Sequence, residues 1–241
     1  MAIVRSRNAL VEARTKLINH VRGAVKSVGG RLSASSSHAF AAKVKDAVPT
    51  ELSTALNPIL QTTQELTQRI EQMDQEVAKL AAKYPAAQKL QQVVGVGPVT
   101  SVSYVLTLED PQRFKKSRSV GSYLGLRPRS QESGASAPQL RITKAGDVYL
   151  RKLLVGCAHY ILGPFGPDTD LRRWGLKLAE RGGKNAKKRA IVAVARKLAV
   201  LLHRLWLTDE AYEPLRNATR QQKSVQQEQM RTTGKRKATA V

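Results

Sequence analysis

A heptad repeat of apolar residues constrains the fold of this chain more than any other feature. The repeat advances in alternating steps of four and three, and only one threonine interrupts its apolar character. Such spacing predicts a coiled-coil helix, which we place within residues 49–84, and Tyr84-Pro85 ends it. The members of the repeat are Leu52, Leu56, Ile59, Thr63, Leu66, Ile70, Met73, Val77 and Leu80.

The repeat leaves the partner of this helix open. Residues 1–48 contain a basic amphipathic helix over residues 5–28 and a serine-rich loop, so one partner is this helix, in an antiparallel hairpin. The other partner is a second copy of the chain, which gives a homo-oligomer through the coiled coil. About four heptads suffice for either arrangement. Pro58 lies near the start of the repeat, so we expect the continuous helix to begin there.

The net charge of the chain indicates which class of partner it binds. Its 41 Lys and Arg residues exceed its 18 Asp and Glu residues and give a formal charge of +23, which favours binding to a polyanion. The sequence has no long uncharged apolar run and no leader-like start, so we expect no membrane partner. The single cysteine, Cys157, indicates a reducing, cytoplasmic location. Because aromatic residues make up only 5%, phosphate contacts with double-stranded DNA are favoured over stacked single strands.

The remaining sequence predicts a compact helical domain over residues 88–208 and a disordered basic tail over residues 209–241. Helical patterns over residues 148–161 and 170–207 alternate with glycine turns, while the Gln-, Lys- and Arg-rich tail has little to bury. The expected fold class is therefore mostly α: a long heptad helix followed by a compact helical domain with helix-hairpin-helix-like turns. We expect His159, Trp174 and Trp206 in its core.

Two glycine turns are candidate phosphate-binding elements. In the first, Gly95 and Gly97 precede Thr100, and a tight turn before a helix presents backbone N–H groups that bind phosphate. A nucleotide-binding fingerprint lacks its third glycine here, and an ordinary helix–helix turn is the simpler alternative. The second turn places cations where a phosphate would be met, and its candidate residues are Arg141, Thr143, Lys144, Gly146 and Arg151.

The order and spacing of several blocks between residues 90 and 207 resemble the C-terminal domain of one family. The matching blocks are residues 94–100, 110–114, 123–126, 128–129, 133–134, 141–146, 149–154 and 193–198. On these blocks the chain resembles the insertion-sequence transposases related to the Piv invertase, including the bridge-RNA-guided recombinases.

The resemblance implies a serine nucleophile. In the family, a serine close before a glycine attacks a DNA phosphodiester and becomes covalently linked to it, and Ser133 with Gly134 matches that position. Ser130 is the alternative nucleophile. The sequence departs from the family after Gly134, where Ala135-Ser136-Ala137-Pro138 replaces the usual glycine and basic residue. Cations that would neutralise the scissile phosphate are Arg127, Arg129 and Arg141.

The family also has an N-terminal RuvC-like domain whose four acidic residues bind divalent metal. Here the first fifty residues offer only Glu12 and Asp46. We therefore expect no metal site and no cofactor in this chain, with Mg²⁺ bound only when the missing acidic domain is present.

The resemblance and the missing acidic residues together define the expected function. It is that of a DNA-binding transposase or site-specific recombinase, truncated and inactive alone, with structured guide RNA as a further partner. The alternative is a non-catalytic DNA- or RNA-binding regulator, or a partner of the full-length transposase in mixed oligomers.

Overall fold

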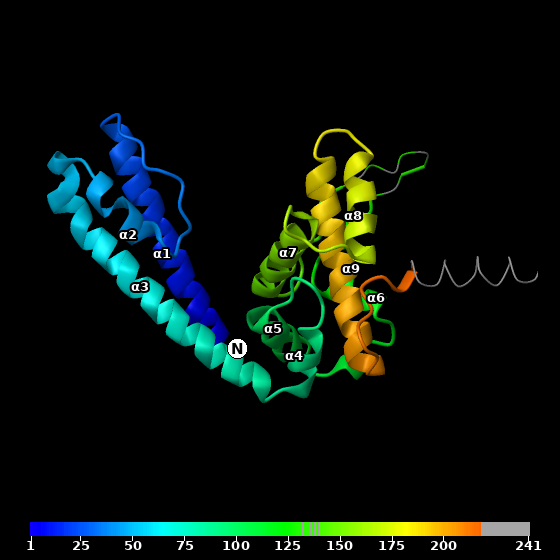
Figure 1. The fold of residues 1–241 in the computed structure, drawn as a ribbon. Coiled ribbons are helices and arrows are strands. Elements are labelled where there is room, and N and C mark those ends of the chain that lie inside the picture. The colour runs from blue at the N-terminus through cyan, green and yellow to red at the C-terminus, as the bar shows by residue number, and fades with distance from the viewer. Residues whose placement is uncertain (132, 135, 137, 139, 218–241) are drawn as a thin grey trace, which may run out of the picture. The chain divides into compact units, whose positions relative to one another are not determined.

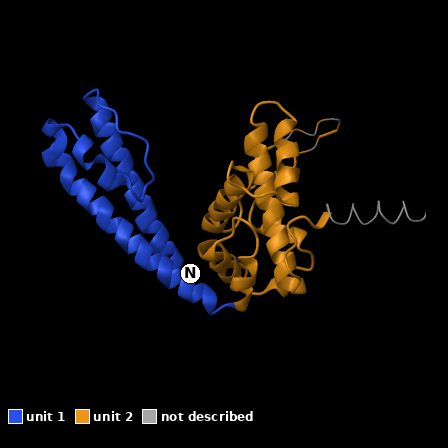
Figure 2. Ribbon diagram, in the orientation of Figure 1, with its two compact units in different colours: residues 1–84 blue, residues 85–241 orange. Residues whose placement is uncertain are grey.

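The computed structural model describes residues 1–131, 133, 134, 136, 138 and 140–217 (Figure 1). The chain divides into two compact units, residues 1–84 and residues 85–241, and each is described by itself (Figure 2). The described residues form helices and no named strand, which confirms the mostly α prediction. None of the helices in these residues is long and apolar enough to cross a membrane.

Unit 1 is a helical hairpin. Its long helices are α1 (Ala2–Ser27) and α3 (Thr50–Ala82), and the connection contains the short α2 (Phe40–Val44) and the 3-10 helix η1 (Lys45–Ala47). Helix α3 runs through Pro58, so the expectation that it begins there was wrong. Leu56 and Leu60 lie on either side of the proline and are buried in the core of the unit. Their burial, about 1.5–3 kcal/mol each, offsets the roughly 3 kcal/mol cost of an interior proline.

Two side-chain pairs fix the register of α1 on α3. The Arg7 guanidinium donates two hydrogen bonds to the Asp74 carboxylate, at 2.7 and 3.0 Å. One heptad further along α1 and one heptad back along α3, Arg14 donates to Thr67 Oγ at 3.1 Å. Steps of seven in opposite directions define an antiparallel pair. The hairpin alternative is therefore the arrangement within the chain.

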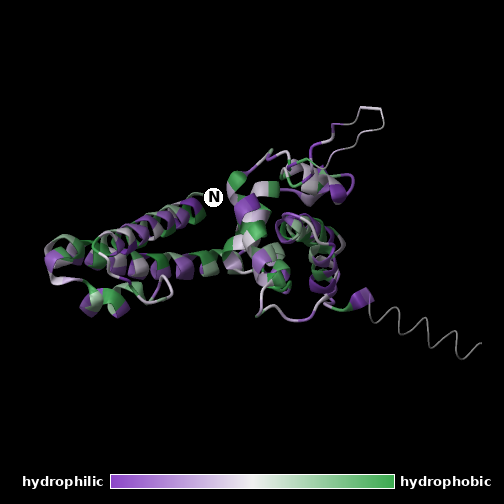
Figure 3. Ribbon diagram, turned by 90° about the horizontal axis from the view of Figure 1, so that it is seen from above, coloured by the Kyte–Doolittle hydropathy of each residue, from purple (hydrophilic) through white to green (hydrophobic). Residues whose placement is uncertain are grey.

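The two flanks of this hairpin differ in polarity. In this register, the residues that directly precede Val4, Ile18 and Val25 of α1 lie on the same side as those that directly precede Leu60, Thr67 and Ala81 of α3. That side is apolar, and we name it the open flank. The opposite side is polar, with residues such as Asn8, Thr15, Gln64 and Glu71. Hydrophilic and hydrophobic residues alternate along both long helices of unit 1 (Figure 3). The open flank consists of nine half-buried residues, namely Ile3, Leu10, Leu17 and Ala24 of α1 with Leu52, Ile59, Leu66, Met73 and Leu80 of α3.

Unit 2 is built around one long helix, α9 (Ala186–Thr208). Helices α4 (Pro85–Leu90), α6 (Arg118–Tyr123), α7 (Val148–Leu162) and α8 (Asp170–Glu180) all contact α9, as does the 3-10 helix η2 (Pro111–Arg113). Helix α5 (Pro98–Leu108) packs on α4 and α7. The buried Tyr104 hydroxyl of α5 donates to the Ala199 carbonyl of α9 at 2.6 Å, which anchors α5 to the centre.

A buried histidine ties the loop before α6 to α9. His203 is fully buried, and its Nε2 lies 2.8 Å from the Pro111 carbonyl oxygen. Because a carbonyl only accepts, Nε2 carries the proton, and Nδ1 accepts from Ser117 Oγ at 2.9 Å when the ring is neutral. His159, in contrast, is exposed on α7, so its expected core position was wrong. The apolar side of α7 packs inward through Leu154 and Ile161 and leaves His159 on the opposite side.

The first residues of the predicted tail contact α8. The Asp170 N–H donates to the Pro214 carbonyl at 2.8 Å, and the Asp170 carboxylate accepts from the Asn217 N–H at 2.6 Å. The remainder of the predicted tail, residues 218–241, lies outside the described residues.

Candidate nucleic-acid interface

An extended arm connects α6 to α7, and we define it as residues 126–143. An antiparallel bridge joins Pro128 to Ile142. On either side of this bridge, the Arg129 N–H donates to the Arg141 carbonyl and the Thr143 N–H donates to the Arg127 carbonyl, both at 2.9 Å. The segments on either side of the tip therefore lie side by side near the base of the arm.

Ser133 lies at the tip of the arm. It forms a second bridge with Ser136, in which each backbone N–H donates to the other residue's carbonyl at 3.2 and 3.0 Å. Gly134 makes the turn possible with φ of 53°, a conformation that glycine adopts readily. Ser133 is exposed, and so is the alternative nucleophile Ser130. Glu132 and Ala135, on either side of this pair, lie outside the described residues.

Three arginines share one face of the arm. Residues directly opposite each other in an antiparallel pair project to the same side, and alternate residues project to the other side. Arg129 and Arg141 therefore share a face with Arg127 and the half-buried Thr143, while Pro128 and Ile142 occupy the opposite face. All three arginines are exposed, and no ion pair with them is found in the described part of the chain. Their positive charge is available to an external anion.

The base of the arm is a close crossing of two backbone segments. At Gly146, with φ of 69°, an added Cβ would lie 2.1 Å from the Tyr123 carbonyl oxygen. At Gly125, with φ of 66°, a Cβ would lie 2.3 Å from the Ala145 nitrogen. The buried Arg151 side chain donates to the Ala145 carbonyl at 2.5 Å and the Leu124 carbonyl at 3.0 Å, one from each segment. The structure thus places Gly146 and Arg151, both predicted DNA contacts, in the support of the arm.

The first glycine turn packs against the other end of α7. A Cβ at Gly95 would lie 3.2 Å from Tyr160 Cδ1, so this glycine permits close packing. Thr100 is buried, with its Oγ 3.6 Å from Cys157 Sγ, and burial raises the pKa of that thiol. Gly97 is the exposed member of the turn. Roughly 18 Å of helix separates this turn from Gly146, so the two glycine turns do not form one site.

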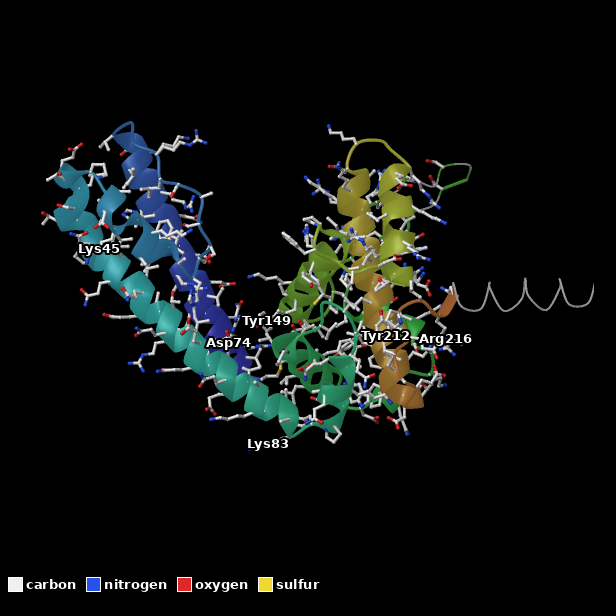
Figure 4. All side chains as sticks on the ribbon, viewed as in Figure 1. Lys45, Asp74, Lys83, Tyr149, Tyr212 and Arg216 are labelled. Carbon is white, nitrogen blue, oxygen red and sulfur yellow. The ribbon has the colours of Figure 1, made fainter. Side chains whose placement is uncertain are left out.

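A groove of about 1130 Å³ lies between the base of the arm, α8 and α9. Its floor is apolar and includes Leu126, Trp174, Leu178, Val192 and Val200. Within the described part of the chain, no Asp or Glu is among the residues that line it. Side chains tipped with nitrogen project from α8 and α9 in Figure 4. Seven basic residues line the groove, and we name them the cationic rim: Arg118, Arg141, Lys144, Lys188, Arg189, Arg196 and Lys197.

Trp174 forms part of the groove. Lys197 places its Nζ 4.1 Å from the centroid of the indole ring, within the range of a cation–π interaction. Burial lowers the pKa of Lys197 from its usual value, because the ammonium has lost part of its hydration. The sequence pattern predicted Trp174 as a core anchor, whereas the structure places it half-buried on the groove side of α8. Sequence reasoning identified the basic face of α9 but missed this aromatic neighbour from α8.

Residues 87–169 match the family model described as "Transposase IS116/IS110/IS902 family". The matched span extends from α4 to the start of α8 and includes the whole arm. The similarity to this family therefore lies within unit 2.

Three curated relatives illustrate the similarity. The chain is 30% identical over 219 residues to the transposase for insertion sequence element IS1111A of Coxiella burnetii, which covers 88% of this chain and 59% of that protein. It is also 30% identical to a probable family 20 transposase of Pseudomonas aeruginosa, covering 87% and 64%. Identity to the pilin gene-inverting protein of Moraxella lacunata is 28%, covering 55% and 41%. The chain thus spans about three fifths of the length of the first two relatives.

Substitution of the two arm glycines tests the crossing at its base. Both Gly146→Ala and Gly134→Ala place alanine at positive φ, which costs about 1–2 kcal/mol. Only Gly146→Ala also drives a Cβ into backbone, since the Cβ at Gly134 meets nothing within 4 Å. We expect Gly146→Ala to lower the unfolding free energy by at least about 2 kcal/mol more than Gly134→Ala, measured by urea denaturation followed by circular dichroism. Equal losses would contradict the crossing.

Proposed function

We propose that this chain is the DNA-acting part of an insertion-sequence transposase or site-specific recombinase whose arm presents Ser133 to double-stranded DNA. The observation that carries the proposal is the arm itself. It has an exposed serine at the tip and three exposed arginines on one face. The similarity to transposases and to a pilin gene-inverting protein supports this chemistry.

The proposed reaction is nucleophilic substitution at phosphorus. Ser133 Oγ loses its proton and bonds to the phosphorus of a phosphodiester. The bond from phosphorus to one bridging oxygen breaks, and this oxygen keeps the electron pair and is protonated to a hydroxyl. The product is a phosphoserine ester to one DNA end. Arg129 is four residues from Ser133, at most about 14 Å along an extended chain, so the arginines suit phosphates that neighbour the attacked one.

Metal activation is not assigned to these residues. A serine hydroxyl is a weak nucleophile until a base or a metal activates it. In the described ranges, no group of three or more His, Cys, Asp or Glu side chains is placed to hold a metal ion. We propose that the chain alone binds DNA, and that strand cleavage requires carboxylates supplied from outside these residues. Binding without cleavage, as a regulator or in mixed oligomers, is the alternative function.

Two further contacts belong to this proposal. Gly97 is exposed where α5 begins without a side-chain cap, so this helix-hairpin-helix-like turn offers a second point for backbone binding to phosphate. Structured guide RNA, the further partner that the family resemblance implies, presents the same phosphate chemistry to the cationic rim.

Charge removal on the arm tests DNA binding. The triple variant Arg127→Ala, Arg129→Ala, Arg141→Ala removes three phosphate contacts. Its slope of log K against log salt for duplex DNA is therefore expected to become shallower by about 2.7. Fluorescence anisotropy across a salt series measures the slope. The matched control removes three exposed lysines of unit 1, Lys26, Lys43 and Lys45, and is expected to retain the slope. An equal change in both triple variants would mean that net charge, and not the arm, binds DNA.

A covalent-adduct assay tests the nucleophile. The chain is incubated with duplex DNA in two arms: alone, and with the full-length Coxiella burnetii relative as the source of carboxylates. The expected result is an adduct of this chain in the second arm only, lost in Ser133→Ala and kept in Ser130→Ala. Denaturing electrophoresis with labelled DNA detects it.

The other outcomes of this assay are equally specific. Loss in Ser130→Ala alone would transfer the reaction to Ser130. An adduct from the chain alone would refute the need for outside carboxylates, and no adduct in either arm would contradict a serine nucleophile in this chain.

We also propose that the chain forms homo-oligomers through the open flank of unit 1. The packing of α1 on α3 buries one column of the heptad repeat. The other column of α3 and the matching column of α1 are only half-buried. Two such flanks packed face to face give a four-helix bundle that buries both. The polar flank offers no equivalent surface.

A charge on the open flank tests this assembly. Leu66→Glu, at the centre of the flank, is expected to shift the chain to monomer in multi-angle light scattering at micromolar concentration, because a carboxylate buried between helices is strongly unfavourable. The matched control is Gln64→Glu on the polar flank of the same helix, which should keep the assembly. A wild-type chain that is monomeric throughout this range would contradict the proposal.

A further inference from the structure

The groove beside the arm combines two surfaces of different chemistry. Among the described residues that line it, the floor is apolar and includes one indole, whereas the rim carries seven cations and no carboxylate. Phosphate binding explains the basic residues of the rim but not the apolar floor, because charged phosphates make no favourable contact with apolar side chains. An occupant that satisfies both surfaces has negative charges along one edge and flat apolar groups along the other.

Duplex DNA does not present both features to a groove. Pairing and stacking hide the faces of its bases, so a duplex offers phosphates to the rim and nothing to the floor. An unpaired strand exposes base faces and backbone phosphates together. A volume of about 1130 Å³ lies above the usual range for small-molecule pockets, which accords with an occupant of more than one nucleotide.

Trp174 is the stacking partner that the floor provides. Lys197 covers the ring at 4.1 Å, and burial on this site lowers the pKa of the ammonium. A base that stacks on the indole replaces an interaction of comparable strength and releases Lys197 to the rim, where a phosphate of the same strand is available. Trp174 and Lys197 thus act as one exchangeable pair.

Charge decides against occupants from this chain itself. The segment 218–241 carries six Lys and Arg residues and one glutamate, so the cationic rim repels it. The formal charge of +23 likewise disfavours this basic groove as a contact with a second copy of the chain, in contrast to the apolar open flank of unit 1.

We propose that this groove binds an unpaired segment of nucleic acid, with a base stacked on Trp174 and its phosphates on the cationic rim. This inference rests on the proposed function, since it identifies a second form of the nucleic acid on which the transposase domain acts. The duplex contacts Arg127 and Arg129 on the arginine face of the arm, and the unpaired segment lies against Pro128 and Ile142, which line the groove at the arm's base. Arg141 lines the groove as well, so it lies where the two surfaces meet.

Tryptophan fluorescence tests the stacking directly. In a Trp206→Phe background, Trp174 is the only indole of the chain. The probes are a single-stranded DNA oligonucleotide, an RNA oligonucleotide of the same sequence, the corresponding duplex and an acidic amphipathic peptide. We expect both single strands to quench Trp174 and the duplex to bind without quenching. A preference between the DNA and RNA strands then identifies which of the two is the natural source of the segment.

Substitutions separate the groove from general charge. In the natural background, Trp174→Leu is expected to weaken single-strand binding about tenfold and duplex binding less than twofold, as measured by anisotropy. Lys188→Ala is expected to weaken single-strand binding several-fold. The matched control is Lys187→Ala, an exposed neighbour that does not line the groove, and it should change binding less than twofold.

Three results would overturn the inference. Equal quenching by duplex and single strands would assign the groove to duplex DNA. Quenching by the acidic peptide alone would make it a protein-docking groove, and unchanged single-strand binding in Trp174→Leu would exclude stacking. Each leaves the proposed function intact as long as duplex binding still depends on Arg127 and Arg129, which do not line the groove, so the two failures are distinguishable.

Discussion

The crossing of two backbone segments beneath the arm positions both the arm and the side of the groove that adjoins it. Glycine at positions 125 and 146 lets two backbone segments cross without a side chain between them. Arg151 holds the two segments together by donating hydrogen bonds to a carbonyl of each. The arm projects from this crossing, and the groove begins at its foot. Arg151, which the sequence predicted as a DNA contact, is therefore a buried residue that supports the arm, because its guanidinium donates hydrogen bonds to carbonyls of both segments.

The heptad repeat predicted the long helix of unit 1 well, but it did not predict what covers it. Apolar periodicity reports that a face is buried and is silent about the partner. The polar pairs Arg7–Asp74 and Arg14–Thr67 set the antiparallel register. Neither pair can be recognised from the sequence of one helix alone, because its two residues lie on different helices. The continuation of α3 through Pro58 was missed for a similar reason, since the leucines that compensate the proline act through tertiary burial.

The candidate site also contains some residues that the sequence predicted and others whose role became visible only in the structure. Ser133 was predicted from the resemblance to a known family, with the three arginines as the cations around its target phosphate, and the structure brings all four residues onto one arm. Thr100 and Gly95 became packing residues, because the sequence of a glycine turn does not reveal which helix lies against it. Trp174 joined the groove from a separate helix. Side chains that come together only in the folded chain share no local sequence pattern, and Trp174 had been predicted as a core residue.

The described arm has a mechanical consequence. Two isolated bridges join its sides, and its tip is seven residues from its base, a lever of at most about 24 Å. A tilt of about 10° at the base would displace the serine by about 4 Å, more than the tolerance of in-line attack on phosphorus. Under the proposed function, the free protein therefore does not hold the Ser133 hydroxyl in an attacking position by itself. In that proposal the contacts with DNA align the hydroxyl, so it attacks only a phosphodiester of a correctly bound target.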